Sequence, residues 1–286
     1  MRKLVAIVLG ATTAAFAWSS LAAEGPVLTK IEKEGVVRIG HREASIPFSY
    51  LDNDRKAIGY SIDLCLEIVN EIKKEIGGKD LKIEYVPVTP QTRIALVANG
   101  TVDLECGSTT NNLQRQKQVA FSPVIFVTGT RLLVPGKSKV AQIEDMNGLV
   151  VAVAQGVANE KPVADAAAAA KINIKFLYVK DIAEGLLAVK TNRADALASD
   201  DILLFGLIHK SGTPDDYKVI GRLLSYEPYG IMMRRDDPAF QLVVRTKLAE
   251  LYRTKKVDQI YDKWFKPIGV PMSEQFRAAR ELEGLN

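Results

Sequence analysis

Most of the motifs by which enzymes are recognised are missing from this sequence of 286 residues. It has only two histidines, His41 and His209, and it contains no H-E-x-x-H, G-x-S-x-G, C-x-x-C or phosphate-loop motif. These absences leave too few ligands for a zinc site and too few bases for a Ser-His-Asp triad. We therefore expect a binding protein without a metal or other cofactor. We expect His209 to lie at the end of a helix, whereas His41 either lines a cleft or packs beside it.

An excess of one charge and long apolar runs are also missing. There are 38 Lys and Arg residues against 34 Asp and Glu residues, a formal net charge of +4, and no run of five basic residues. This balance does not favour binding to nucleic acid. No stretch reaches the ~18 apolar residues of a membrane-spanning helix. With 47% hydrophobic residues the chain can still bury a sizeable core, which excludes a disordered protein.

The N-terminus predicts export. Arg2 and Lys3 precede the apolar stretch 4–18, and Ser20-Leu21-Ala22 follows the small-x-small rule of signal-peptide cleavage. We expect residues 1–22 to form a signal peptide and the mature protein to be soluble in a bacterial periplasm. A buried N-terminal helix is the alternative.

Cysteine is scarce, since only Cys65 and Cys106 are present. An even pair in an oxidising compartment favours a disulfide, which would close a loop of about 40 residues and contribute about 3 to 4 kcal/mol. Two buried free thiols are the alternative, because sequence spacing does not give the distance between the two Cα atoms.

The apolar periodicity alternates between strands and helices in two successive cycles. The first cycle predicts strands over 35–40, 81–88 and 102–104 and helices over 62–72 and 94–97. The second predicts strands over 150–153, 172–176 and 196–197 and helices over 163–170 and 182–190. This alternation is typical of an α/β fold with a doubly wound, mainly parallel sheet in each unit.

Two extended stretches, 126–133 and 229–233, flank the second unit, and an amphipathic helix is predicted from 240 to about 264. If both stretches are crossings, the chain leaves the first unit and returns to it. This path predicts two hinged lobes with a cleft between them, where small ligands bind. Two independent domains on one linker are the alternative.

Three arginines follow predicted strands or their loops: Arg42, Arg93 and Arg115. Ligands of open α/β sheets bind outside the carboxyl ends of the strands, and the planar guanidinium binds carboxylates through two hydrogen bonds. The polar run 108–112 lies between the second and third arginines and is either the start of a helix or part of a ligand cradle.

The opposite charge comes from Asp200 and Asp201, which follow a predicted strand of the second unit. Either aspartate can cap the following helix, or one can cap while the other binds an ammonium group. An acidic group that faces arginines across a cleft indicates a zwitterionic ligand.

Four segments of the sequence are distinctive: Gly40-His41-Arg42-Glu43, Gly59-Tyr60-Ser61, the stretch from Glu105 to Asn112, and Asp262-Lys263-Trp264-Phe265. They closely resemble the periplasmic glutamate/aspartate-binding proteins of ABC importers, which are solute-binding proteins of the family 3 type. The stretch from Glu105 to Asn112 is the most specific, and the others are shared more widely. The resemblance covers the mature chain and implies a type II periplasmic-binding-protein fold. Residues 23–128 and 230–286 would form one lobe and residues 129–229 the other, with two hinge crossovers.

The resemblance also implies a role for individual residues. Arg115, Ser108 and Thr110 would hold the α-carboxylate of the ligand, together with the backbone N–H of Val157. Asp200 would hold the α-ammonium group, and Arg42 and Arg93 would receive the side-chain carboxylate. The implied partners are an acidic amino acid and an inner-membrane ABC permease with its ATPase, and the protein is expected to be a monomer.

Three departures from the family pattern leave the ligand open. Pro90 replaces a serine, the stretch 155–158 replaces Ser-Gly-Thr-Thr, and Ile182 replaces a histidine. Another dicarboxylate or a polar amino acid is therefore an alternative ligand, with Gln155 as a candidate replacement donor. A periplasmic dehydratase of the cyclohexadienyl type is an alternative function, with Glu43 or Glu160 as its general acid. A free sensory domain is a further alternative.

Overall fold

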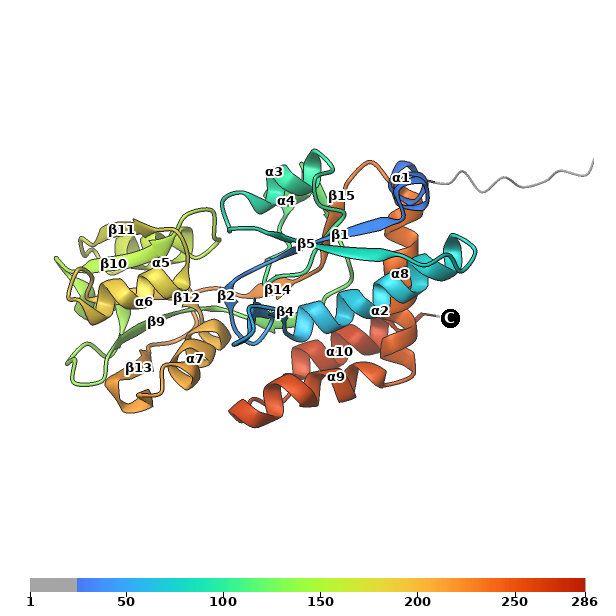
Figure 1. Ribbon diagram of the computed structural model, residues 1–286. Coiled ribbons are helices and arrows are strands. Elements are labelled where there is room, and N and C mark those ends of the chain that lie inside the picture. The colour runs from blue at the N-terminus through green and yellow to red at the C-terminus, as the bar shows by residue number, and fades with distance from the viewer. Residues whose placement is uncertain (1–24, 286) are drawn as a thin grey trace, which may run out of the picture.

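Two five-stranded sheets organise the computed structural model, which describes residues 25–285 (Figure 1). We call the part of the chain built around the first sheet lobe 1 and the part built around the second sheet lobe 2. The predicted signal peptide lies outside the described residues. None of the helices between residues 25 and 285 is long and apolar enough to cross a membrane.

Lobe 1 contains the sheet with the strand order β5-β1-β6-β15-β7. Its strands are β1 (Val36–His41), β5 (Lys82–Pro87), β6 (Leu104–Glu105), β7 (Val119–Phe121) and β15 (Met232–Arg234). Strand β1 is parallel to β5 and β6, whereas β15 is antiparallel to both of its neighbours. All strands except β15 therefore run in one direction, and the prediction of a mainly parallel sheet holds for this lobe.

The remaining elements of lobe 1 surround this sheet. A small sheet is formed by β2 (Ala44–Ser45), β3 (Ser49–Leu51) and β4 (Ala57–Ile58). The helices are α1 (Pro26–Glu34), α2 (Tyr60–Glu75), α3 (Arg93–Ala98), α4 (Leu113–Gln116), α8 (Pro238–Arg253), α9 (Lys256–Phe265) and α10 (Glu274–Glu283).

Lobe 2 repeats the same plan with the strand order β11-β10-β12-β9-β13. Its strands are β9 (Thr130–Pro135), β10 (Val150–Ala154), β11 (Lys175–Val179), β12 (Ala196–Asp200) and β13 (Tyr217–Ile220), and its helices are α5 (Glu160–Ala169), α6 (Ile182–Lys190) and α7 (Asp201–Lys210). Strand β10 is parallel to β11 and β12, and β9 is the reversed strand. In each lobe the reversed strand is thus the one that directly follows a crossing between the lobes.

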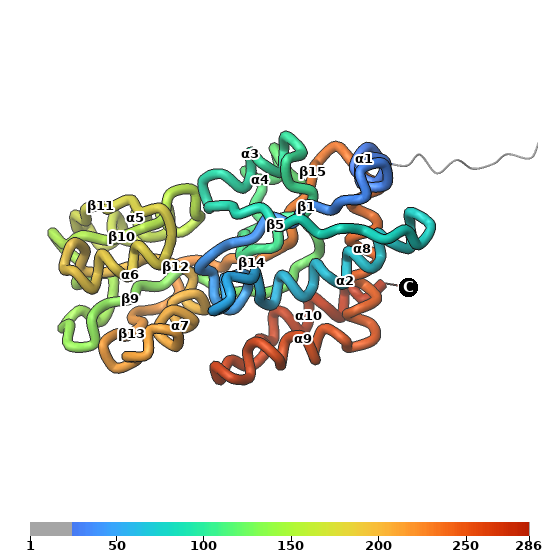
Figure 2. Tube along the Cα trace, viewed as in Figure 1, coloured from blue at the N-terminus to red at the C-terminus, as the bar shows by residue number. Residues whose placement is uncertain are grey.

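The chain crosses between the lobes twice, which rejects the single-linker alternative (Figure 2). The crossing strands β8 (Phe126–Thr128) and β14 (Glu227–Tyr229) pair with each other antiparallel, with Val127 opposite Pro228. The two strands lie side by side also beyond this pairing, because a Cβ atom on Gly129 would lie 2.1 Å from the carbonyl oxygen of Ser225.

Aromatic packing joins these crossing strands to lobe 1. The ring of Phe48 contacts Phe126 of β8 and Tyr229 of β14 edge to face, with centroids 5.0 and 5.1 Å apart. On the other side Phe126 stacks on Phe265 of α9 at 4.9 Å. Aromatic pairs in these geometries stabilise beyond their buried area. The crossing strands are therefore held in the core of lobe 1.

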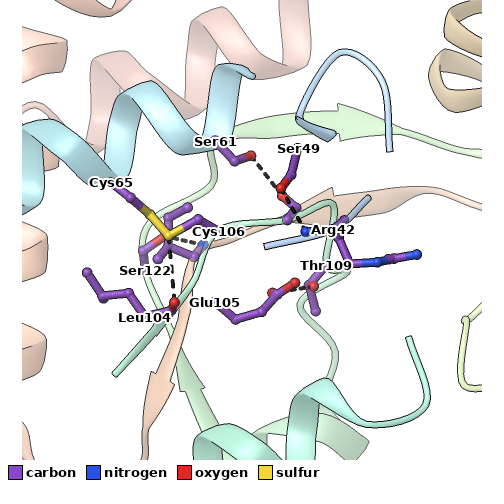
Figure 3. Close-up of a disulfide and its surroundings, with 11 residues drawn as sticks. Arg42, Ser49, Ser61, Cys65, Leu104, Glu105, Cys106, Thr109 and Ser122 are labelled. Carbon is purple, nitrogen blue, oxygen red and sulfur yellow. Dashed lines mark hydrogen bonds between the residues drawn. A yellow bond between two sulfur atoms is a disulfide. The ribbon is translucent and has the colours of Figure 1, made fainter. Parts of the chain in front are cut away.

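The predicted disulfide is confirmed, with Cys65 of α2 bonded to Cys106, the residue after β6 (Figure 3). Their Cα atoms lie 6.3 Å apart, within the range that a disulfide spans. Both residues are fully buried. The bond ties the helix that covers the sheet to the strand that leads into the polar run 108–112.

The single helix predicted from 240 to about 264 is wrong. Helix α8 ends at Arg253, and Lys255 adopts a left-handed conformation with φ of 58° before α9 begins. Neither Gly nor Pro marks this break, and apolar residues continue at helical spacing on both sides of it. The new direction lets α9 pack on α2, where Lys256 Nζ lies 2.8 Å from Glu67 Oε1.

Candidate ligand-binding site

A cavity lies between the two lobes, and its polar lining residues are almost fully buried. All of the residues that we expect to hold the ligand line this cavity except Arg115, which bonds the carbonyl of the lining residue Thr110. The lining residues from lobe 1 are Arg42, Ser45, Pro90, Arg93, Ser108 and Thr110, and those from lobe 2 are Val157, Ala158, Asn159, Ile182, Ser199, Asp200 and Leu203.

Arg42 directly follows β1, at the carboxyl end of a central strand. Its backbone N–H donates to Ser49 Oγ at 2.9 Å, which fixes the turn out of the sheet. Its guanidinium makes no hydrogen bond to residues 25–285 of the structure. Burial, together with the charge of Arg93, lowers the pKa of Arg42 to about 10. The side chain is therefore a buried cation at neutral pH that is available to a ligand.

Arg93 is the first residue of α3 and is only 2% exposed. Its Nη1 donates to Thr109 Oγ1 at 2.5 Å and to the Ser108 carbonyl at 3.3 Å. Its Nε atom is buried and has no partner among the described residues. Burial lowers the pKa of Arg93, and the nearby Glu105 carboxylate opposes that shift. A buried donor without a partner is unfavourable until something accepts its hydrogen bond.

The polar run 108–112 is both a helix start and part of the cavity lining. The Asn112 side chain caps α4 by accepting from the backbone N–H of Arg115 at 2.9 Å. Ser108 and Thr110 line the cavity. The hydroxyl of Ser108, like that of Ser45, is buried without a partner in the described part of the chain. The prediction of a helix start is therefore confirmed, and the run also lines the cavity, while its contact with a ligand stays a prediction.

Arg115 joins the two lobes at the edge of the cavity. Its guanidinium donates to the Thr110 carbonyl at 2.8 Å and to the Gly156 carbonyl of lobe 2 at 3.0 Å. Burial, and secondarily the charge of Arg93, lowers its pKa to about 10. The lobes also touch here, because a Cβ on Gly156 would lie 2.7 Å from the Pro90 carbonyl oxygen. The structure is therefore closed at this edge.

Asp200 is the buried carboxylate of the cavity and lies at the end of β12. One of its oxygens accepts from Asn159 Nδ2 at 2.7 Å, and the other accepts from the Tyr229 hydroxyl of the crossing strand β14. Burial and the nearby Glu227 raise the pKa of Asp200 to about 7, although the two hydrogen bonds act in the opposite direction. This carboxyl is therefore poised to lose its proton when a cation binds beside it.

The neighbouring Asp201 has a different role. Its Oδ1 accepts from the backbone N–H of Ile202 at 2.7 Å and from Thr128 Oγ1 at 2.6 Å. Asp200 occupies the N-cap position of α7 but makes no capping hydrogen bond with its side chain. One aspartate therefore bonds the first turn of the helix while the other lines the cavity, and binding of an ammonium group by Asp200 stays a prediction.

Asn159 and Tyr229 were missed by the sequence analysis. Asn159 follows the departing stretch 155–158 by one residue, and it lines the cavity where Gln155 had been expected to supply a donor. Gln155 is exposed and lies outside the lining. Tyr229 had been assigned only to the second crossing. No local pattern marks either residue as a partner of Asp200, since the contacts span 41 and 29 residues of sequence.

The histidine and the acids named for other roles lie outside the cavity lining. His41 is buried, with Nδ1 3.1 Å from the Arg42 carbonyl and its ring edge to face with Tyr85. Glu43 is exposed, and Glu160 accepts a hydrogen bond from Tyr178 at 2.7 Å. The general acids considered for a dehydratase are therefore not placed to act on a ligand in this cavity.

The cavity has buried cations on one lobe and a buried carboxylate on the other, and the paired crossing strands join the two lobes. These features define a binding protein for a small charged solute. Residues 37–267 match the family of bacterial extracellular solute-binding proteins, family 3. The chain belongs to this family, and the curated relatives that it resembles most are solute-binding proteins of importers, not enzymes.

Similar proteins agree with this assignment. The chain is 44% identical over 259 residues to the L-glutamate/L-aspartate-binding protein of Pseudomonas aeruginosa, covering 87% of this chain and 86% of the relative. It is 40% identical over 290 residues to the glutamate/aspartate import solute-binding protein of Salmonella typhimurium, covering 100% and 96%. The crystal structure of the P235GK mutant of ArgBP from T. maritima superposes with a TM-score of 0.74 at 27% identity, over 84% of this chain and 99% of that one.

Proposed function

We propose that this protein captures L-glutamate or L-aspartate between its lobes and delivers it to an inner-membrane ABC permease that works with its own ATPase. The observation that carries this proposal is the placement of the buried Arg42 and Arg93 in one cavity with the buried Asp200. Two arginines attract a side-chain carboxylate, and the aspartate attracts an ammonium group. The relatives at 40% and 44% identity carry glutamate and aspartate in their names, which supports the same ligands here.

Each end of the ligand has its own set of side chains in this proposal. Arg42 and Arg93 receive the side-chain carboxylate. Ser108, Thr110, Arg115 and the backbone N–H of Val157 hold the α-carboxylate, and Asp200 holds the α-ammonium group. The buried hydroxyl of Ser108 and the buried Nε of Arg93, which lack partners among the described residues, support this assignment because a carboxylate accepts from both kinds of donor.

In this proposal the permease recognises the closed arrangement of the two lobes. Residues 23–128 and 230–286 form the lobe that carries the arginines, and residues 129–229 form the lobe that closes. The two sheets support this division, because one contains β1, β5, β6, β7 and β15 and the other contains β9 to β13. We expect a periplasmic monomer, exported through a signal peptide over residues 1–22.

Calorimetric titration of the mature, ligand-stripped protein tests the proposal. L-glutamate and L-aspartate should bind with a Kd in the micromolar range or below, which corresponds to about 8 kcal/mol or more. L-glutamine, L-asparagine and a neutral amino acid serve as controls and should bind much more weakly. Absence of heat with both acids would contradict the proposal and direct the search to other dicarboxylates.

The Arg42→Gln variant tests the assignment of the side-chain end. Because it removes one of the two cations facing that carboxylate, it should weaken glutamate binding about 100-fold and glutamine binding less than tenfold. An equal loss of affinity for the two ligands would show that Arg42 does not contact the side chain of the ligand.

A further inference from the structure

Glu105 is a fully buried carboxylate behind the arginines of the cavity, and it does not line the cavity itself. It is the last residue of β6 and precedes the disulfide-bonded Cys106. Its Oε1 lies 3.9 Å from Arg93 Nη1 and has no hydrogen-bond partner in the described part of the chain. Its Oε2 accepts from Thr109 Oγ1 at 2.6 Å, a contact visible in Figure 3.

Thr109 links this carboxylate to Arg93. The threonine hydroxyl accepts from Arg93 Nη1 and donates to Glu105, so that the three side chains form one chain of hydrogen bonds. The arrangement anchors Arg93 through Nη1 and leaves its Nε unpaired at the cavity. Glu105 therefore helps to position the guanidinium that we expect to meet the ligand.

Gly107 lets the same carboxylate approach Arg42. A Cβ atom on Gly107 would lie 2.2 Å from Glu105 Oε1 and 3.0 Å from Arg42 Cγ. Any side chain at this position would therefore push the carboxylate away from the stem of Arg42. Glu105 thus lies behind both arginines of the side-chain end, and its charge acts on both.

The charges at this end of the cavity are unequal. Two buried arginines face one buried glutamate, which leaves one net positive charge among the buried side chains, and buried ions are stable only when they are compensated. Asp181 also acts on Arg42, but it is partly exposed and its carboxylate caps α6. A ligand side chain with one negative charge completes the balance, whereas a side chain with two negative charges exceeds it. This matching requires the Glu105 carboxylate as well as the two arginines.

We propose that Glu105 is a positioning residue that determines specificity: it limits the side-chain end to monoanionic groups and selects against dianionic ones. This inference rests on the proposed function. A purely structural role for Glu105, such as holding the loop after Cys106, would change the affinity for every ligand by the same factor. A role in charge selection changes the ratio between ligands that have the same shape and different charge.

O-phospho-L-serine and L-serine O-sulfate are such a pair. Both carry a tetrahedral group on the serine oxygen, and this group has two negative charges in the phosphate and one in the sulfate. At pH 8 the phosphate monoester is a dianion, since its second pKa is about 6. Their affinities are measured by competition with L-glutamate for the wild-type protein, Glu105→Gln and Glu105→Asp. Glu105→Gln keeps an acceptor for Thr109, and Glu105→Asp keeps the charge.

In Glu105→Gln the ratio of the two affinities should move toward phosphoserine by about tenfold or more, because one negative charge near the bound phosphate has been removed. In Glu105→Asp the ratio should stay within about threefold of the wild-type ratio, even if both ligands bind more weakly. Equal changes for both ligands in Glu105→Gln would overturn the proposal.

A second arm applies if Glu105→Gln does not fold or if the cavity excludes both serine esters. The double variant Arg93→Gln/Glu105→Gln removes a cation and an anion together, so that the buried side chains at this end keep one net positive charge. Arg93→Gln alone should reduce the preference for glutamate over glutamine by about tenfold or more, and the double variant should restore it to within about threefold. If the double variant prefers glutamate over glutamine no more than Arg93→Gln does, the result would contradict a role of the Glu105 charge in selectivity.

Binding of glutamate to the wild-type protein separates the two hypotheses. Failure of the wild type to bind either acid would overturn the proposed function and this inference with it. Binding of glutamate with ratios that do not move in either arm would overturn the role of Glu105 alone.

Discussion

Lobe 1 lines the cavity with Arg42, Arg93, Ser45, Ser108 and Thr110, whereas lobe 2 lines it mainly with Val157, Ala158, Ile182 and Leu203. The charged side chain of lobe 2 in the lining is Asp200, supported by Asn159. Although both lobes have the same sheet plan, they supply different chemistry. We infer that lobe 1 selects carboxylates, while lobe 2 supplies an apolar wall and an ammonium site.

The lobes differ in covalent structure as well. The disulfide between Cys65 and Cys106 lies in lobe 1, next to the strand that leads to the polar run 108–112. The sequence has no other cysteine, so lobe 2 has no corresponding bond. The lobe that carries the buried cations is thus the one with a cross-link beside them. The predictions below test this division of roles.

The largest effect is expected for Arg115, because its hydrogen bonds belong to both lobes. Replacing it by Ala removes the proposed partner of the α-carboxylate and the hydrogen bond to Gly156. The affinity for glutamate and for glutamine should fall alike, by about 1000-fold or more, or ~4 kcal/mol. Calorimetry with both ligands checks this result, with Arg131→Ala, which lies outside the lining, as the control. A loss confined to acidic ligands would show that Arg115 belongs to the side-chain end.

Removal of the disulfide should weaken lobe 1 without changing its ligand preference. The double variant Cys65→Ser/Cys106→Ser should lose about 4 kcal/mol of unfolding free energy, because a loop closed over a sequence separation of 41 gains that entropy when the bond is absent. Trp264 of α9 lies in lobe 1 and is the one tryptophan outside the predicted signal peptide. Urea unfolding followed by its fluorescence measures the loss, and a loss below about 1 kcal/mol would contradict the prediction.

The charge of lobe 2 should make binding depend on pH. Since the pKa of Asp200 is about 7 and a bound ammonium favours the charged carboxylate, binding releases up to one proton below pH 7. The affinity for glutamate should therefore fall by up to about tenfold for each pH unit between pH 7 and pH 5. Titration in buffers of different ionisation enthalpy measures the released proton. Asp200→Asn should bind weakly and release none, and an unchanged proton release in that variant would assign the effect to another group.

The same pKa shift has the opposite consequence for the ligand-free fold. A carboxyl whose pKa is raised in the folded state from 3.8 to about 7 favours folding when protonated. Its contribution is fully present below pH ~3.8 and is lost as the pH rises through about 7. Asp200→Asn should therefore stabilise the ligand-free protein at pH 8 while it impairs binding.

The smallest effect is expected when a polar group is added to the apolar wall. Ile182 lines the cavity at the start of α6, where the resemblance places a histidine. Ile182→His should raise the affinity for glutamate about fivefold relative to glutamine, because a new donor reaches the acidic side chain. Ile182→Leu keeps the wall apolar and is the matched control. An equal gain with glutamine would show that the ligand's side chain does not meet this wall.

The sequence was most informative where a pattern is local. The alternation of apolar residues located α6 at 182–190, and the positions of Arg42 and Arg93 after their strands placed both in the cavity lining. Strand direction explains this success, because the carboxyl ends of parallel strands meet at one edge of a sheet. The break at Lys255 was missed because no Gly or Pro marks it, and packing of α9 on α2 determines the new direction.

Contacts between distant segments could not be predicted from one sequence. Glu105 belonged to the most specific segment of the resemblance, yet its relation to Arg93 depends on how α3 packs near β6. Tyr229 was assigned to the second crossing, and its bond to Asp200 exists only because β14 passes behind the cavity. Hydrophobic periodicity carries no information on which polar groups meet across the core.

The pairing of β8 with β14 has a mechanical consequence. Two separate linkers would let one lobe twist, slide and bend against the other, whereas a two-stranded ribbon held by interstrand hydrogen bonds bends across its plane and resists shear within it. Opening and closing are thereby restricted to nearly one coordinate. If ligands close the protein as we propose, different ligands bring the outer surfaces of its lobes into the same relative orientation, so that a single shape signals occupancy.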